Sequence, residues 1–268
     1  MRQRQRFARA IGTLVAFVSA AGVAFAQPNA NGCSALPNHG TLKAALDKAT
    51  AEEKSGLNNH MWVTIVDRDG VVCAVAFSGT DRAAQWPGSR VISAQKASTA
   101  NAFGLDSSSS SGGSGQKTGL ALSTANLYSA VQPGGSLFGL QFSNPVDTSV
   151  AYYGFYASHG TAQDPMTGAR VGGVNVFGGG LGLYAAGKRM VGGVGVSGDT
   201  SCADHNIAWR VRAILGLDHL MGVGGVSGDK ERPDNIIFDI ANGASKGGFG
   251  HPQCLNTGDV TMLPAVKE

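Results

Sequence analysis

Histidines have the widest chemistry among the side chains of this sequence, because imidazole acts as a metal ligand, as an axial ligand to haem iron, and as an acid or base. The six histidines show neither the spacing His-x-x-x-His nor His-Glu-x-x-His, so a zinc centre of that kind is not indicated. A single histidine suffices to ligate haem iron. His205 and His251 are the better candidates, because each lies in a glycine-rich segment close to a cysteine.

Two glycine motifs match known functional patterns. Gly193, Gly195 and Gly198 fit the Gly-x-Gly-x-x-Gly fingerprint of dinucleotide sites, but that fingerprint must open a strand–helix–strand unit, and here it closes a series of apolar runs. Exposed amides at the helix that follows could still hold a carboxylate. The motif Gly-x-Ser-x-Gly around Ser245 continues into a loop, so we expect no hydrolase nucleophile there.

The four cysteines are Cys33, Cys73, Cys202 and Cys254, and no Cys-x-x-Cys occurs. The spacing therefore disfavours a zinc ribbon, a thioredoxin-like site and covalent haem attachment. An even number in an exported chain predicts two disulfides, for which three pairings are possible. We favour Cys33–Cys73 with Cys202–Cys254, because each bridge then stays within one half of the chain.

The first 26 residues have the three parts of a secretion signal. Four arginines and no acid precede an apolar run over residues 11–25, which ends in the small-residue pattern Ala24-Phe25-Ala26. The run is shorter than the roughly 20 apolar residues of a membrane-spanning helix. We therefore predict cleavage before Gln27 and a periplasmic or secreted protein without stable membrane insertion.

Removing this signal changes the net charge. The whole chain carries 21 Lys+Arg and 18 Asp+Glu, a formal charge of +3, and loss of four arginines with no acid leaves −1. No cluster of basic residues follows, so a nucleic acid partner is not expected. The hydrophobic content of 43% is enough for a folded core.

The first half of the mature chain alternates helical and strand-like patterns. Apolar residues at helical spacing predict a helix over 41–55. Two apolar runs around Asp69-Gly70 predict a hairpin. Helical composition returns over 90–103 and 119–130, on either side of a Ser/Gly-rich loop at 107–115.

The second half opens with a long irregular stretch over residues 132–169, rich in Pro, Gly, Ser and aromatics, of a kind that is often functional. Three apolar runs broken by glycines follow, and we interpret them as an antiparallel meander. They cover residues 171–177, 181–186 and 190–196. A helix is expected over 203–215 and a last strand over 235–240. This order predicts an α+β fold with an antiparallel sheet flanked by helices.

Three blocks of the sequence resemble the GlcG/HbpS family of haem-binding proteins, which includes the C-terminal domain of PduO proteins. The blocks are VTIVDRDGVVCAVAFSG, AQKASTANAF and GGVGVSGDTSCADHNIA. The likeness runs from the helix near Leu42 through that of Ile207. It implies a profilin-like domain over 27–268, homo-oligomers and non-covalent binding of haem or a related tetrapyrrole.

The resemblance and the histidine analysis together nominate a set of cofactor-binding residues, with no catalytic residue among them. The set is Lys96, Thr99, Gly193, Gly195, Ser197, Asp204, His205 and His251, the two histidines being the candidate iron ligands. We expect a β-branched residue at Gly195 to weaken haem uptake while the protein stays folded.

Three additions separate this chain from short family members, and they could form a site of their own. They are the Ser/Gly-rich loop, the 132–169 stretch and a C-terminal extension over 217–268 that contains GFGHPQC. The main expectation is a haem-binding or haem-handling protein. The alternatives are an enzyme acting on a small carboxylate, since GlcG is associated with glycolate utilisation genes, and an assembly protein without a ligand.

Overall fold

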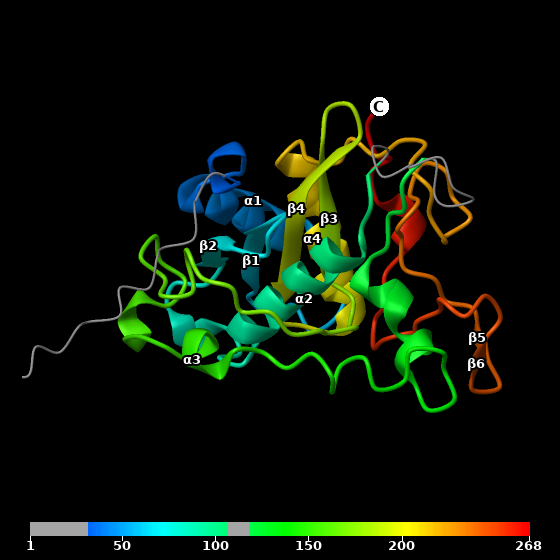
Figure 1. The fold of residues 1–268 in the computed structure, drawn as a ribbon, viewed down its shortest axis with the longest axis horizontal. Helices are drawn as coiled ribbons and strands as arrows, with labels where there is room; N and C mark the ends of the chain where they lie inside the picture. The colour runs from blue at the N-terminus through cyan, green and yellow to red at the C-terminus, as the bar shows by residue number, and fades with distance from the viewer. Residues whose placement is uncertain (1–31, 107–117) are drawn as a thin grey trace, which may run out of the picture.

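The computed structural model describes residues 32–106 and 118–268 (Figure 1). The predicted signal over 1–26 and the loop at 107–115 lie outside these residues. Within the described ranges, no helix is long and apolar enough to cross a membrane.

A four-stranded antiparallel sheet forms the centre of the molecule, in the order β2-β1-β4-β3. Its strands are β1 (Trp62–Asp67), β2 (Val72–Phe77), β3 (Gly180–Ala185) and β4 (Arg189–Ser197). The predicted hairpin is confirmed: β1 pairs with β2 across a turn in which Gly70 has a φ of +77°, a conformation that favours glycine. β4 then pairs with β1 on one side and β3 on the other.

Helices cover both faces of this sheet (Figure 1). α1 (His39–Glu52) and α4 (Ser201–Ile214) pack on one face, where Val63 and Ile65 of β1 join their apolar core. α2 (Ser89–Phe103) packs on the other face, against Trp62 and Val66. α3 (Thr148–Ala151) is a single turn. The predicted α+β architecture is therefore confirmed.

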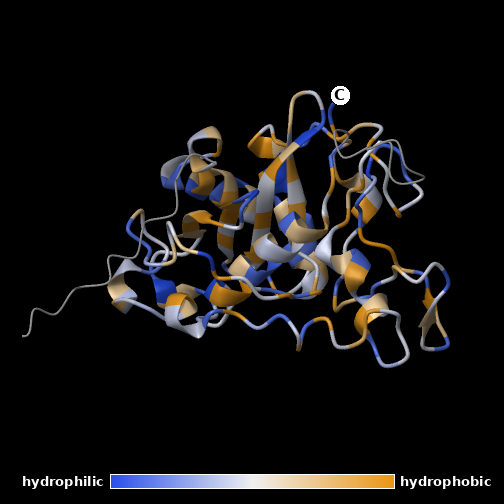
Figure 2. Ribbon diagram, in the orientation of Figure 1, coloured by the Kyte–Doolittle hydropathy of each residue, from blue (hydrophilic) through white to orange (hydrophobic). Residues whose placement is uncertain are grey.

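The alternation of valine and glycine in β4 explains how α2 comes so close to the sheet (Figure 2). Val194 and Val196 enter the core on the α1/α4 face. Gly193 and Gly195 face α2, and a Cβ at Gly195 would lie 2.0 Å from the carbonyl oxygen of Ser93. Only glycine allows this approach, so Gly193 and Gly195, the first two glycines of the Gly-x-Gly-x-x-Gly match, are required for helix packing.

Residues 119–130 do not form the predicted helix. They form two short 3-10 turns, Thr124–Leu127 and Ser129–Val131. The hydroxyl of Ser123 donates to Asn126 Oδ1 at 2.9 Å, and the Asn126 amide donates to the Asn235 carbonyl at 3.0 Å. These contacts compete with helical hydrogen bonds, as Ser and Asn side chains commonly do.

Two predicted strands are also absent from the main sheet. Residues 171–177 contain Gly172 and Gly173 at φ of +66° and +81°, which an extended strand cannot accommodate. Residues 235–239 form no strand, and their backbone bonds to other groups: the Ile236 amide donates to Asn235 Oδ1, and the Ile237 carbonyl accepts from the His251 amide. Only Ile240–Ala241 and Ala244–Ser245 form a small two-stranded sheet.

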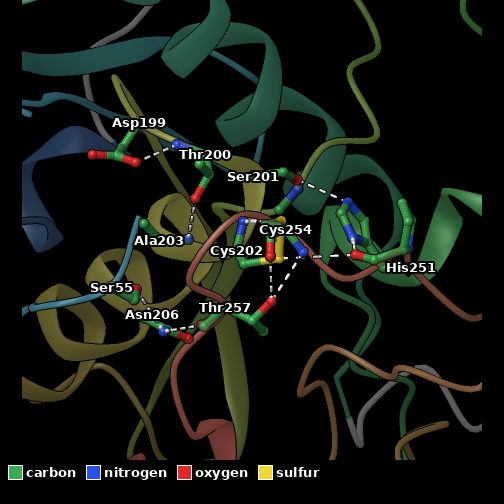
Figure 3. The surroundings of a disulfide bond; sticks show 12 residues. Ser55, Asp199, Thr200, Ser201, Cys202, Ala203, Asn206, His251, Cys254 and Thr257 are labelled. Carbon is green, nitrogen blue, oxygen red and sulfur yellow. Dashed lines mark hydrogen bonds between the residues drawn. A yellow bond between two sulfur atoms is a disulfide. The ribbon is translucent and has the colours of Figure 1, made fainter. Parts of the chain in front are cut away.

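The segment after α4 returns to the domain core. The Trp209 indole of α4 donates to the Pro264 carbonyl at 2.9 Å, and the Tyr184 amide of β3 donates to the Leu217 carbonyl at 2.8 Å. Leu263 and Val266 join the core on the α1/α4 face. Residues 217–268 thus bring His251 and Cys254 beside the start of α4 (Figure 3).

Candidate functional site

Both disulfides follow the pairing that the sequence favours. Cys33 is joined to Cys73, and Cys202 to Cys254. All four cysteines lie among the described residues, and none of them is free. The first bridge ties the segment before α1 to β2, and the second ties the N-terminus of α4 to the C-terminal loop.

Lys96 of α2 and Asp204 of α4 form a buried ion pair. Lys96 Nζ lies 2.6 Å from Asp204 Oδ2 and donates to the Val196 carbonyl at 3.0 Å. The other carboxylate oxygen accepts from the Asp199 amide at 2.8 Å. Burial raises the pKa of Asp204 to about 6 and lowers that of Lys96, and their attraction opposes both shifts. The pair connects α2, β4 and α4.

The remaining polar residues predicted on α2 and β4 also have protein partners. Thr99 Oγ1 donates to the Gln95 carbonyl at 2.7 Å and accepts from the Asn175 amide at 3.0 Å. Ser197 is buried opposite Trp62 in the sheet. Lys96, Asp204 and Ser197 therefore lie close together where α2 and α4 meet β4, whereas Thr99 binds within α2 and to the loop at Asn175.

His205 is enclosed by protein. Its Nε2 lies 3.2 Å from both Asn235 Oδ1 and the Ile236 amide nitrogen, and its Nδ1 has no hydrogen-bond partner among the described residues. Burial lowers the pKa of His205 to about 4, so the ring is neutral at pH 7. The side chain is fully excluded from solvent.

His251 is held at both ring nitrogens (Figure 3). Nδ1 lies 2.7 Å from the Pro252 carbonyl, which can only accept, so Nδ1 carries the proton in the neutral ring. Nε2 then accepts from the Ser201 hydroxyl at 2.8 Å, and that oxygen accepts from the Gly178 amide at 2.6 Å. Burial lowers the pKa of His251. The ring also lines a hollow of about 260 Å³.

Side chains already occupy amides at the N-terminus of α4, where the sequence suggests a carboxylate site. The Thr200 amide donates to Asp199 Oδ1 at 2.5 Å, and the Ala203 amide to the Thr200 hydroxyl at 3.3 Å. The Cys202 amide donates to Cys254 Sγ at 3.1 Å (Figure 3). These contacts satisfy amides that a bound anion would otherwise use.

A hollow of about 360 Å³ lies beside the end of β2, at residues that the sequence did not nominate. Its lining residues are Phe77, Asp81, Arg82, Ala83, Tyr156, Ala157 and His159. The Arg82 guanidinium lies over the Tyr156 ring, 4.7 Å from its centroid. His159 Nε2 is buried without a hydrogen-bond partner among the described residues. Burial and the nearby Arg90 lower the pKa of His159, so the ring is neutral at pH 7.

The signal that could have located this hollow was the aromatic stretch over 132–169. Tyr156 and His159 belong to it, three residues apart, whereas Phe77 and Arg82 come from the end of β2 and the turn after it. Three further large aromatic residues, all exposed, precede Tyr156 closely in the sequence: Tyr152, Tyr153 and Phe155. The two segments lie about 75 residues apart in the sequence. Sequence patterns report on residues a few positions apart, so no pattern predicts that these segments meet.

A match to a protein-family model shows which family the chain belongs to. A family model described as "Haem degrading protein HbpS-like" matches residues 41–213. This chain belongs to the HbpS-like family. The matched part of this HbpS-like protein begins in α1 and ends in α4, which confirms the resemblance in its quoted blocks. The extension over 217–268 lies beyond it.

Solved structures similar to this HbpS-like chain include three of low sequence identity. A PduOC–haem complex is 23% identical, over 67% of this chain and 94% of that one, with a TM-score of 0.43. The Klebsiella pneumoniae protein ORFY is 22% identical, over 67% and 90%, with a TM-score of 0.42. A double mutant of Streptomyces reticuli HbpS is 15% identical, over 77% and 99%, with a TM-score of 0.36. No curated protein matches the chain.

Proposed function

We propose that this protein binds haem non-covalently after export. Membership of the HbpS-like family, which is described as haem-degrading, is the observation that carries the proposal. Two disulfides support an oxidising compartment, because such bonds persist outside the cytosol. Homo-oligomer formation stays a prediction of the family resemblance, and light scattering of the mature protein would measure it.

The hollow at Tyr156 and His159 has the chemistry that a tetrapyrrole needs. The rings of Phe77 and Tyr156 offer apolar surface for a flat macrocycle, and the Arg82 guanidinium offers a cation for its propionates. Its volume of about 360 Å³ lies within the usual range for small-molecule sites. Because the hollow is open, part of the macrocycle would extend over the exposed aromatic surface.

Two donors in this hollow are chemically able to ligate haem iron, an imidazole and a phenol. His159 is neutral, and its Nε2 is a buried acceptor without a partner, which costs about 1–3 kcal/mol in the haem-free chain. Tyr156 lies three residues earlier with an exposed side chain. Since His159 Nε2 is shielded from solvent, coordination through it requires rotation of the ring.

The residues nominated from the sequence are the second candidate site. There His251 borders a smaller hollow, and binding to iron would break its contact with Ser201 or Pro252. His205 would have to leave an enclosed position between Asn235 and Trp209. Both histidines stay proposals as iron ligands. His159 is the better first choice, because its Nε2 has no hydrogen bond to break and its ring borders the larger of the two hollows.

Haem titration of the mature protein tests the function and the site together. We expect saturable binding in the micromolar range or tighter, with a Soret band that differs from free haem. His159→Ala and Tyr156→Phe should each shift the Soret maximum or weaken binding if that side chain ligates the iron. His251→Ala reports on the second site, and His60→Ala, at an exposed histidine that lines neither of the two hollows, is the matched control.

The outcomes separate function from location. A wild-type protein with no saturable Soret change would contradict haem binding. The alternatives, an enzyme acting on a small carboxylate or an interaction protein, would then be favoured. Tight binding that depends on His251, while His159→Ala and Tyr156→Phe bind as wild type, would move the site to the N-terminus of α4. Circular dichroism of each variant shows whether it is folded.

A further inference from the structure

We propose that reduction of the Cys202–Cys254 disulfide creates a binding site for a thiolate-preferring divalent cation such as zinc, with His251 as the third protein ligand. One ligand atom from each of these three residues lies within 4.8 Å of the others. Ligands of one tetrahedral zinc ion, at about 2.0–2.3 Å from the metal, lie less than about 4 Å apart. Small side-chain movements are therefore sufficient to close the site.

The identity of the ligands selects the metal. Two thiolates and an imidazole are the donors of tetrahedral zinc sites, and three protein ligands leave a fourth position for water. Hard cations such as magnesium and calcium need oxygen donors, which this cluster does not supply. The site belongs to two segments, the start of α4 and the loop around Cys254, so a bound ion would bridge them as the disulfide does.

The start of α4 stabilises the negative charge of the reduced site. Cys202 is the second residue of α4, and its own amide donates to Cys254 Sγ at 3.1 Å. The positive end of the helix dipole favours thiolate anions at this position. Thiolates, and not thiols, are the metal ligands, so this environment prepares both sulfurs for an ion.

His251 is already oriented for the same purpose (Figure 3). Its two nitrogens contact the Ser201 hydroxyl and the Pro252 carbonyl, at 2.8 and 2.7 Å. An ion at either nitrogen displaces one of these contacts, and the other contact continues to hold the ring. Metal-bound histidines nearly always have such a hydrogen bond on the second nitrogen.

The site is within reach of solvent. Cys254 is half-buried in an exposed loop, and His251 borders the hollow lined by Phe238, Ile240 and Gln253. A small reductant can therefore approach Cys254, whereas Cys202 is fully enclosed. Water in the hollow can supply the fourth ligand.

The redox chemistry requires a dithiol as reductant. The dithiol gives two electrons to the protein disulfide, breaking the bond between the two sulfurs, and itself becomes a disulfide. The two protons of the dithiol go to the thiols of Cys202 and Cys254, and both are released to solvent when the cation binds the thiolates. The oxidised chain cannot bind the ion in this way, so redox state controls binding.

The other disulfide offers a matched comparison within the same chain. Cys33, Cys73 and Asp67 are equally close together. Asp67 Oδ1, however, accepts from the Asp69 and Val71 amides at 3.0 and 2.9 Å, which holds the hairpin turn. Asp67 Oδ2 is buried without a partner among the described residues, so this cluster also has a free donor atom. A carboxylate suits zinc less well than the imidazole of His251 does, and this cluster is therefore the weaker zinc site.

Alkylation of the reduced wild-type protein tests the proposal without any substitution. The four thiols are generated with a dithiol, the reagent is removed, and iodoacetamide labelling is followed by peptide mass spectrometry with and without Zn²⁺. We expect zinc to cause loss of labelling at Cys254, the thiol of this pair that a reagent can reach, but not at Cys33 and Cys73. Equal protection of Cys254 and of the Cys33/Cys73 pair, or protection of neither, would overturn the assignment.

Cobalt binding then tests the ligand set. In a Cys33→Ala/Cys73→Ala background, the reduced protein should bind one Co²⁺ with thiolate charge-transfer absorption and tetrahedral d–d bands, and the oxidised protein should show neither. His251→Ala should weaken binding by at least about 10-fold, whereas His60→Ala should leave the affinity unchanged. A His251→Ala variant that binds Co²⁺ with the charge-transfer band and the affinity of the parent protein would contradict the proposed ligand set.

Discussion

Single buried side chains carry much of the electrostatics of this protein. The neutral ring of His205 lies between Asn235 and Trp209 inside the C-terminal half. The Lys96–Asp204 pair lies between α2 and α4, with both side chains almost fully excluded from solvent. Each of these groups is costly to charge or to leave without a partner in the interior, so each makes stability depend on one residue.

His205 makes the protein less stable in acid. Its pKa is lowered from 6.5 in the unfolded chain to about 4 by burial, so the unfolded state binds a proton that the folded state does not. Its contribution is therefore present above pH 6.5 and is lost as the pH falls toward 4, by up to about 3 kcal/mol. Urea unfolding of wild type and His205→Gln between pH 7 and pH 4 measures this. An equally steep loss in His205→Gln would refute the assignment.

Removing one partner of the buried ion pair should be strongly destabilising. Lys96→Met leaves the Asp204 carboxylate buried without its cation, at a cost of about 3–5 kcal/mol. Lys48→Met on the solvent-facing side of α1 is the control, since the ion pair of Lys48 with Glu52 is in solvent and contributes below about 1 kcal/mol. Denaturant unfolding gives both values. A double variant, Lys96→Met/Asp204→Leu, should recover part of the lost stability, and a double variant as unstable as Lys96→Met would argue against an unpaired charge as the cause.

At the scale of elements, the contact between α2 and β4 controls the architecture. Backbone atoms of α2 approach Gly193 and Gly195 so closely that added side chains would overlap them. This clearance argues against the expectation that a β-branched residue at Gly195 leaves the folding of the protein unaffected. A valine there meets the Ser93 carbonyl and the Ala97 amide, which are backbone atoms that cannot move without displacing the helix.

Gly195→Val should destabilise the fold before it affects any ligand. We expect a loss of at least about 1–3 kcal/mol, because overpacking forces α2 away from the sheet. Gly40→Ala is the matched control, since a Cβ at this exposed position in the first turn of α1 would meet only Asn38 Oδ1, at 3.5 Å, and alanine favours the helix. Thermal unfolding followed by circular dichroism compares the two. A Gly195→Val protein as stable as wild type would contradict the packing argument.

At the scale of the whole molecule, two covalent bridges tie distant segments to the domain. The Cys33–Cys73 and Cys202–Cys254 bonds close loops of 40 and 52 residues in sequence separation. We expect denatured, unreduced mature protein to show no reaction with a thiol reagent, and Cys202→Ala/Cys254→Ala to cost about 2–5 kcal/mol. Four reactive thiols in that assay would show that the bridges do not form in the isolated protein.

Export is the second expectation at this scale. The arginine-rich start and the Ala24-Phe25-Ala26 pattern predict that the mature chain begins at Gln27. N-terminal sequencing of protein from the periplasmic or secreted fraction measures this directly. An intact Met1 in that fraction would rule out the predicted cleavage.

Local signals in the sequence were sufficient for the elements that depend on neighbouring residues. The Asp69-Gly70 turn, α1, α2 and α4 form near their predicted bounds, because caps, helical spacing and turn residues act over a few positions. Two segments depart from their predicted structure. Residues 119–130 form no helix, because they bond to remote partners such as Asn235, and residues 171–177 form no strand, because two of their glycines adopt a left-handed conformation.

The candidate site shows the same division. The sequence alone nominated the residues around Lys96 and Asp204 and the favoured disulfide pairing, all of which the fold brings together. Only the tertiary structure shows that Asp204 balances the charge of Lys96, and that Gly195 is needed for α2 to pack against the sheet. The hollow at Tyr156 could be found only in the structure, because segments far apart in the sequence form its walls. Residue type and spacing, in contrast, predict only how neighbouring residues are arranged.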